Sequence, residues 1–496
     1  MAKVVEERGF FWWFNEPDLP AHSKETSVPA LLVITDDGQI TLDVEGSLSG
    51  NDEHRDWNKS RNLSALRRIA GLLASPNEYV LLEGLERTDF SLDDASPQQQ
   101  AFTAQSCTRR DLAFAETYGD DDFVELRGEM TGLEDWLELD SFLVSTEHDD
   151  GTAVHVDISY RKHQLTYSVF GGTLSIESIT TGADTLGFSS RYPQRDLKFE
   201  QTYYLVFRPE SPSHISSLRY CYSRLEEFLA LLLGAYYRFD WPIVVRKEEP
   251  FDVWDKVYFH RGEPASQTIN RHFSWIPFSR MRDAFGSLFE EWQKGIEAYG
   301  AGYYLYVSSL RNPYPYAEDR FVNLVWALEA LHRKWLAEPE SSPRIIEEKK
   351  RVERILNQFS KDDKDQRWLR KKLAHAHEPS LETRILECLR KLPFTFGRGQ
   401  LEQFAKSCAI RRNDISHEGG PRGDMDYESF HVEITRLAEA LDHLYHALLL
   451  HQMGIAPRVL LEAMTSSWVS ERRLKPALAN VGLDIKAASS TQSGDA

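Results

Sequence analysis

The segment Cys408-Ala-Ile-Arg-Arg-Asn-Asp-Ile-Ser-His-Glu-Gly-Gly-Pro421 lies between two stretches with helical periodicity. The upstream stretch runs from Leu401 to about Asn413, and the downstream stretch, Asp426–Gln452, is long and strongly amphipathic. Asn, Asp and Ser compete for backbone hydrogen bonds, and Gly-Gly-Pro cannot continue a helix. We therefore expect the first helix to loosen within this segment, where Arg412 and His417 would be turned towards one cleft.

Three residues of this segment, Arg412, Asn413 and His417, suit the cleavage of RNA. A guanidinium is permanently charged and binds phosphate through two parallel donors. An imidazole exchanges protons near neutral pH, so it can take the ribose 2′-OH proton or protonate the leaving oxygen. Asn413 would orient a phosphate oxygen or the imidazole. Attack of the 2′-OH on the adjacent phosphate needs neither a bound water nor a cation, so no metal or cofactor is predicted.

The spacing by itself leaves a structural alternative open. Residues five apart on an uninterrupted helix are separated by about 140°, so Arg412 and His417 converge only where the helix is broken. Arg370 and His375 show the same spacing elsewhere in the chain. The alternative is that Arg412 and His417 form a helix cap and a surface pair.

The C-terminal part of the chain is predicted to be all helix after Asn312-Pro313-Tyr314-Pro315, where two prolines block helix continuation. Short connections between amphipathic helices indicate a compact antiparallel bundle. The last forty or so residues are expected to hold one weak helix and a disordered end. The predicted helices of the bundle are Ala317–Leu336, Pro343–Phe359, Asp365–Ala374, Ser380–Leu392, Leu401 to about Asn413, and Asp426–Gln452.

The N-terminal part is predicted to be β-rich, as a sandwich or an open barrel. Asp36-Asp37-Gly38 separates two strand-forming runs, which is typical of a hairpin. Residues 91–110 are polar and are expected to form a loop. Two helices, Ile215–Tyr237 and Ser279–Tyr299, are expected to close this domain. Further strands are expected at residues 153–158, 165–170, 202–207, 242–245 and 257–259.

Charge is unevenly distributed along the 496 residues. Residues 1–300 contain 29 basic and 50 acidic residues, whereas residues 301–496 contain 29 basic and 27 acidic residues. Phosphate is repelled by an acidic surface, so nucleic-acid contacts are expected in the C-terminal part, with the basic cluster at 367–372 as one candidate. For any single lysine or arginine of this cluster, a solvated helix face is the favoured interpretation. The four scattered cysteines and the absence of a long apolar run favour a reducing, cytoplasmic setting without a membrane span.

Residues 316–452 resemble the HEPN superfamily, whose members share a small helical bundle and a motif of the form found at Arg412-Asn413-Asp414-Ile415-Ser416-His417. Residues 320–332 and 378–385 look like helices of the ApeA-like branch of anti-phage HEPN proteins. The β-rich region, with its opening hairpin at residues 31–46, is similar to the domain fused to such HEPN modules.

The resemblance implies an anti-phage, abortive-infection endoribonuclease, with RNA, and transfer RNA in particular, as the candidate substrate. It implies a homodimer or a larger homo-oligomer in which two copies of the motif build one cleft. It also implies that the N-terminal domain senses a phage-derived trigger and restrains the nuclease. Glu329 matches a recurrent acidic position of the family's opening helix and would hold the Arg412 guanidinium in place; the alternative is an exposed helix carboxylate.

These expectations define a multidomain α+β protein: a β-rich sensor domain over residues 1–310, a HEPN helical bundle over 311–454 and an extension over 455–496. A different function is a non-catalytic HEPN module that dimerises the chain or binds a partner, with recognition assigned to the N-terminal domain. Retention of both Arg412 and His417 favours the nuclease.

Histidines and aromatics outside the motif are further candidates. His443 and His446 share a helix face, which would suit a metal, but ordinary packed or solvated side chains are the favoured interpretation. The aromatic runs at residues 10–14 and 303–306 could stack on bases, but core or interdomain packing is favoured.

Overall fold

A computed structural model of the chain describes residues 2–14, 27–46, 48, 68–74, 78–88, 100–111, 123–139, 142–149, 152–181, 200–248, 251–261, 269, 274–311, 316–358 and 364–486. By its contacts the chain divides into two compact units, one made of 1–226 with 237–269 and the other of 227–236 with 270–496. The domain limits predicted from the sequence stay predictions. The predicted boundary at residues 312–315 lies outside the described residues.

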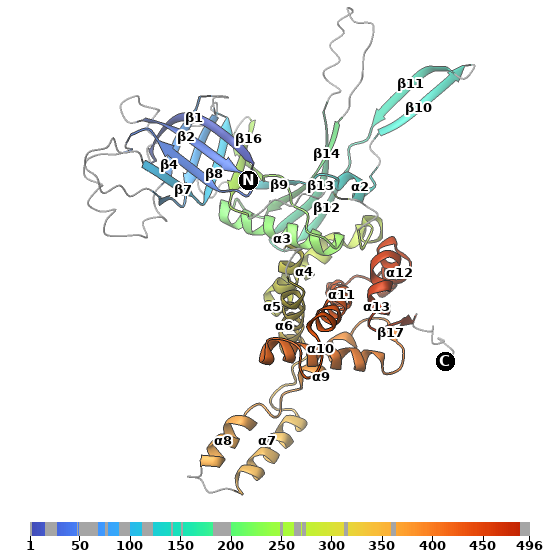
Figure 1. Cartoon of the computed structure of the whole chain (residues 1–496). Helices are drawn as coiled ribbons and strands as arrows, with labels where there is room; N and C mark the ends of the chain where they lie inside the picture. Colours follow the sequence, from blue (N-terminus) through green and yellow to red (C-terminus); the bar gives the residue numbers. More distant parts are fainter. Residues whose placement is uncertain are drawn as a thin grey trace, which may run out of the picture. The chain divides into compact units, whose positions relative to one another are not determined.

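The first unit is built on one antiparallel sheet, which has 14 strands within the described residues (Figure 1). Buried residues of its N-terminal strands form a common apolar core. A separate hairpin pairs β10 (Phe142–Asp149) with β11 (Thr152–Tyr160). From one edge of the sheet to the other, the strands are β12 (Gln164–Val169), β13 (Gly172–Thr181), β14 (Glu200–Pro209), β9 (Phe123–Glu129), β15 (Ile243–Glu248), β16 (Phe251–Phe259), β8 (Ser106–Asp111), β5 (Glu78–Glu83), β4 (Arg68–Leu73), β1 (Lys3–Phe14), β2 (Val28–Thr35), β3 (Ile40–Val44), β7 (Gln100–Ala104) and β6 (Glu86–Arg87).

The predicted hairpin at Asp36-Asp37-Gly38 is confirmed, because β2 and β3 pair on either side of it with Ile34 opposite Ile40. Gly38 has φ 83°, and a Cβ at this position would collide with the backbone carbonyl of Phe259. The glycine is therefore required both by the turn and by the close approach of another strand.

The loop predicted over residues 91–110 is wrong where the structure describes it. Residues 100–104 form β7 and residues 106–111 form β8. Phe102 and Cys107 are fully buried in the sheet core. Buried apolar residues alternate with polar ones over only a few positions in each strand, so the strand pattern is hard to recognise beside the glutamine-rich run. Residues 91–99 lie outside the described part of the chain.

A fully buried ion pair connects β8 to β16. Both side chains, Arg110 and Asp255, are completely inaccessible, and Arg110 Nε donates a 2.7 Å hydrogen bond to Asp255 Oδ1. Arg246 Nη2 lies 3.7 Å from the same carboxylate. The low dielectric of the core makes an unpaired charge at this site costly.

Replacing Asp255 by alanine is expected to destabilise this unit by about 3–5 kcal/mol, because two arginines would stay buried without their carboxylate. Urea unfolding followed by tryptophan fluorescence measures the effect. Glu45→Ala, which removes the exposed partner of Arg8, is the matched control and should leave the transition nearly unchanged. Equal midpoints for the two variants would contradict the prediction.

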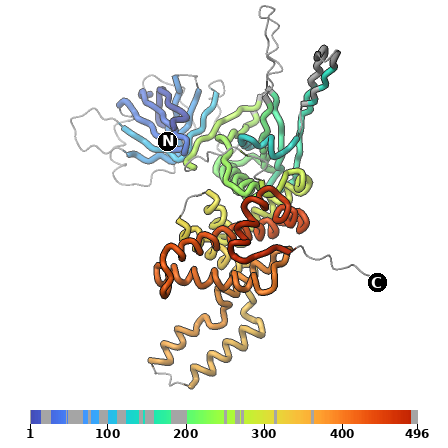
Figure 2. The backbone as a smooth tube through the Cα atoms, turned by 45° about the vertical axis from the view of Figure 1, so that its right-hand side comes forward, coloured from blue at the N-terminus to red at the C-terminus, as the bar shows by residue number. Residues whose placement is uncertain are grey.

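The second unit is mainly helical and is drawn in yellow to red in Figure 2. The predicted apolar face of α6 (Ala317–Trp335) is buried, including Phe321, Leu324 and Leu328. Five helices pack against α6: α4 (Phe285–Tyr299), α5 (Ala301–Arg311), α9 (Leu381–Leu389), α10 (Gln400–Glu418) and α11 (Tyr427–Gln452). Further helices are α7 (Pro343–Leu356), α8 (Lys364–Leu373), α12 (Pro457–Ser466) and α13 (Lys475–Ala479).

Several helix limits differ from the sequence prediction. α3 (Ile215–Leu233) ends four residues before the expected Tyr237, because Gly234 adopts φ 75°. The helix predicted from Ser279 begins with 3-10 turns before α4, and α5 was not predicted. Tyr303 and Tyr306 of α5 are buried, which confirms core packing for these two aromatics.

The C-terminal segment is more structured than the single weak helix expected there. α12 and α13 both bury leucine side chains, and β18 (Ile485–Lys486) pairs with β17 (Thr395–Phe396). Among the described residues no helix is both long and apolar enough to cross a bilayer.

Candidate functional site

The Arg-Asn-x-x-x-His motif lies on α10, which continues without a break to Glu418. The helix was expected to loosen near Asn413, and this expectation is wrong. It ends at Gly419, which adopts φ 72° and donates its N–H to the Ile415 carbonyl. Asp414 does not disrupt the helix, because its buried carboxylate accepts a 2.9 Å hydrogen bond from Arg411, one turn earlier.

The continuous helix fixes the relative directions of the motif side chains. Arg412 and His417 are about 140° apart around the axis and about 7.5 Å apart along it. Asn413 lies between these two directions and shares the side of His417 at a spacing of four residues. Within one chain, therefore, the guanidinium and the imidazole do not converge on one phosphate.

Arg412 points towards α6, where it meets Glu329. Its Nη2 atom lies 3.8 Å from Glu329 Oε2, and each side chain is 22% exposed. Its Nη1 atom donates a 3.3 Å hydrogen bond to Asn413 Oδ1. The contact between Arg412 and Glu329 is longer than a hydrogen bond, so the guanidinium is directed by the carboxylate while most of its donors stay uncommitted.

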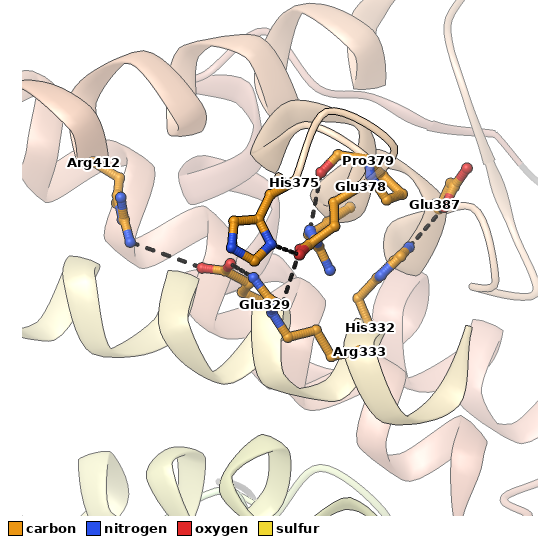
Figure 3. A network of polar contacts seen from close by, with 9 residues as sticks. Glu329, His332, Arg333, His375, Glu378, Pro379, Glu387 and Arg412 are labelled. Atoms are coloured by element: carbon orange, nitrogen blue, oxygen red, sulfur yellow. Dashed lines mark hydrogen bonds and ion pairs between the residues drawn. The ribbon is translucent and has the colours of Figure 1, made fainter. Parts of the chain in front are cut away.

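Glu329 is itself part of a chain of ion pairs, shown in Figure 3. Its Oε1 atom accepts a 3.0 Å hydrogen bond from Arg333 Nη2, and Arg333 Nη1 lies 3.0 Å from Glu378 Oε2. Arg384 Nη2 donates to the same Glu378 oxygen at 2.6 Å. The charges thus connect α10 through α6 to the segment before α9.

Glu378 is held ionised at the end of this chain. Desolvation acts against ionisation, but the hydrogen bond with His375 and the charges of Arg333 and Arg384 outweigh it and lower the pKa of Glu378. His375 Nδ1 lies 2.7 Å from Glu378 Oε1. Neither Arg333 nor Glu378 is predicted for this role from the sequence, since ion pairs between separate helices leave no periodic signal.

His417 and Asn413 are exposed at the C-terminal end of α10. Within the described residues His417 forms no hydrogen bond or ion pair. The neighbouring Arg411, in contrast, is committed to structure, because it binds both Asp414 and, at 2.8 Å, Glu433 of α11. Of the two adjacent arginines, only Arg412 is available for a ligand.

His443 and His446, which were also considered from the sequence, are packed residues. His446 stacks on Trp275 with ring centroids 4.5 Å apart and shares a 2.7 Å hydrogen bond with Tyr306. Burial lowers its pKa to about 4 and also lowers the pKa of His443. The packed interpretation is confirmed for both, and no cluster of three metal-binding side chains occurs within the described residues.

Comparison with known families identifies the class of protein that carries this site. Residues 322–458 match the family described as Apea-like HEPN, so the helices around the motif form a HEPN domain. Residues 6–292, more than half of the chain, match the family described as ApeA N-terminal domain 1. The chain therefore belongs to the ApeA-like HEPN proteins, a family associated with anti-phage defence and HEPN RNase activity. No curated protein and no solved structure matches the chain.

Glu329→Gln is expected to lower the cleavage rate about tenfold, equivalent to about 1.4 kcal/mol, by releasing the Arg412 guanidinium from its direction. The KM for RNA should not rise, because the substitution removes a negative charge beside Arg412, the arginine predicted to bind phosphate. Steady-state cleavage assays separate kcat from KM. Glu433→Gln, which frees the neighbouring Arg411, is the matched control and should retain the wild-type rate. Equal kcat values for wild type and Glu329→Gln would contradict the positioning role.

Proposed function

We propose that this protein is an endoribonuclease of anti-phage defence that cleaves RNA without a metal ion, in a cleft built by two copies of the HEPN domain. The observation that carries the proposal is that α10 holds both Arg412 and His417 in an accessible state. The Arg412 guanidinium is directed by Glu329 but keeps most of its donors free, and His417 is exposed without a partner among the described residues. These are the two groups that phosphodiester cleavage requires, a phosphate-binding fork and a proton-transfer group.

A second copy of the chain could bring together Arg412 and His417, which point apart within one chain. A two-fold axis beside the exposed side of α10 would bring His417 of one protomer next to Arg412 of its partner. The HEPN family typically dimerises and binds RNA, in agreement with this arrangement. The composite cleft would then hold two guanidiniums and two imidazoles.

Two imidazoles account for both proton transfers of the reaction. One takes the proton of the 2′-OH while the 2′-oxygen forms a bond to the adjacent phosphorus. The bond from phosphorus to the 5′-oxygen breaks, and the second imidazole protonates that oxygen. The guanidiniums and Asn413 offset the charge that develops on the phosphate. The products are a 2′,3′-cyclic phosphate and a 5′-hydroxyl end.

Abortive infection follows from this chemistry if the nuclease acts on host or phage RNA, with transfer RNA as the candidate substrate. We assign the N-terminal sheet unit to sensing a phage-derived trigger and to restraining the nuclease until infection. Restraint by the N-terminal unit would allow an uninfected cell to carry a toxic nuclease without harm.

The end chemistry of the cleaved RNA tests the proposal. Sequencing of RNA ends after expression of the chain, with and without phage infection, should find new 2′,3′-cyclic phosphate ends, and purified protein should retain its cleavage rate in EDTA. Cleavage that is lost with EDTA, or that leaves 3′-hydroxyl ends, would reject the mechanism. A protein that dimerises but leaves RNA intact even in infected-cell extract would indicate the non-catalytic HEPN module instead.

A further inference from the structure

The helical hairpin formed by α7 and α8 is strongly basic in a chain whose net charge is −19. Its helices, residues 343–356 and 364–373, contain ten Lys and Arg but only four Asp and Glu. The two helices hold each other, because Gln366 of α8 donates a buried 3.0 Å hydrogen bond to the Leu356 carbonyl of α7. In Figures 1 and 2 they lie side by side as an antiparallel pair.

The cations of the hairpin fall into two groups. Four are neutralised in ion pairs of 2.9 to 3.7 Å: Arg344 with Glu338, Lys349 with Glu340, Arg351 with Glu348 and Arg370 with Glu353. The other six are exposed and form no ion pair within the described residues: Lys350 and Arg354 on α7, and Lys364, Arg367, Lys371 and Lys372 on α8.

The four unpaired cations of α8 share one side of the helix with an exposed tryptophan. At 100° per residue, Lys364, Arg367, Trp368, Lys371 and Lys372 span an arc of about 140°. Trp368 lies inside this arc and is 59% exposed. Gln366, on the opposite side, is buried. We call this outward side, made of these five residues, the basic face of α8.

The composition of the basic face indicates the chemistry of its partner. Four cations that form no ion pair within the described residues attract a row of phosphates, and an indole exposed among them offers a surface for a stacked base. A membrane-binding helix would present a broad apolar face, but the leucines of α8 are half-buried on the side away from Trp368. On these grounds a polynucleotide with unpaired bases fits better than a lipid surface.

The hairpin is joined at its base to the candidate site. His375 follows α8 by two residues and pairs with Glu378. Glu378 binds Arg333, which shares Glu329 with Arg412. RNA bound to the hairpin would therefore lie on an element that is connected through these ion pairs to Arg412 of the motif.

We propose that the basic face of α8 binds the substrate RNA, with the four cations on consecutive phosphates and Trp368 stacked on an unpaired base. The identification of the bound RNA as the substrate rests on the proposed function, but the binding itself can be measured without cleavage. It defines the substrate class as RNA that exposes single-stranded bases, such as the loops and ends of transfer RNA, and not as a uniform duplex.

Binding is tested in the full chain carrying His417→Ala, with bulk transfer RNA as the probe. Replacing Lys364, Arg367, Lys371 and Lys372 together by glutamine should weaken binding at least about tenfold near 0.1 M salt and reduce the slope of log affinity against log salt by about 3, or 0.7–0.9 per phosphate contact. The matched control replaces the four paired cations, Arg344, Lys349, Arg351 and Arg370, by glutamine and should bind nearly as well. Circular dichroism establishes that both variants are folded.

Stacking is tested separately with Trp368→Ala. This variant should bind transfer RNA about tenfold more weakly while its binding to polyphosphate, which has no bases, stays unchanged. Trp368→Phe should retain most of the RNA affinity. Equal losses on RNA and polyphosphate would overturn the stacking role.

The outcomes separate this inference from the proposed function. If the two quadruple variants bind RNA equally, the inference is overturned whether or not RNA is cut. It is also overturned if the same four basic-face substitutions, made in the chain that retains His417, increase the cleavage rate. If the face binds RNA as described but the His417 chain never cleaves it, the inference stands and the nuclease proposal fails.

Discussion

His417→Ala in the full-length chain is expected to reduce RNA cleavage by about 10²–10⁴-fold, the contribution typical of a positioned proton-transfer group. The side chain is exposed and has no partner among the described residues, so its removal should leave the melting temperature unchanged. Arg412→Ala should lose activity by a similar factor, because the phosphate would lack its guanidinium. The measurement is the initial rate of cleavage of labelled RNA, with growth of expressing cells as a second readout.

Matched controls exist for both substitutions. His431→Ala removes an exposed histidine of α11 that pairs with Glu318, and Arg422→Ala removes an exposed arginine that pairs with Glu418. Both should cleave at the wild-type rate. If the His417 and Arg412 variants retained more than about a tenth of the wild-type rate while folded, the motif would not be the active site.

Mixing the Arg412→Ala and His417→Ala chains is expected to restore cleavage at least about tenfold above either variant alone. The reason is geometric: on the continuous α10 the two side chains diverge, so a productive pair should combine Arg412 of one chain with His417 of the other. A mixed dimer would then contain one complete pair. Differently tagged chains, purified through both tags after co-expression, provide the sample.

Each variant expressed with a second tagged copy of itself is the control and should stay inactive. The mixed dimer keeps one imidazole, which can serve one of the two proton transfers, so its rate should stay below that of the wild type. Mixed dimers that form in good yield but are as inactive as either variant alone would contradict the composite pairing proposed for this protein.

Much of the fold followed from local patterns. The alternation of apolar and polar residues at 40–44 and the turn at Gly38 predicted a hairpin that the structure contains. Successive side chains of a strand point to opposite faces, so a strand with one buried face shows this alternation in its local sequence. α6 and α11 were predicted for the corresponding reason at helical spacing. The strands at residues 100–111 were missed because their apolar positions are few and only pairing with distant strands makes them a sheet.

The site was predicted in part. Its residues were read from the motif, and the meeting of Glu329 with Arg412 was expected and is observed at 3.8 Å. The expected loosening of the helix was wrong because the ion pair between Arg411 and Asp414, at a spacing of three residues, satisfies the buried carboxylate within the helix. Arg333 and Glu378 were not recognised, since their roles depend on helices far apart in the chain.

Local sequence patterns predicted the motif residues Arg412, Asn413 and His417 and the division of the chain into a β-rich and a helical part. The directions of the side chains depend on how the helices pack. The direction of Arg412 depends on a carboxylate of another helix, and the basic face of α8 is defined by which cations find partners. Composition and periodicity are properties of neighbouring residues, whereas ion pairing is settled only when distant segments pack.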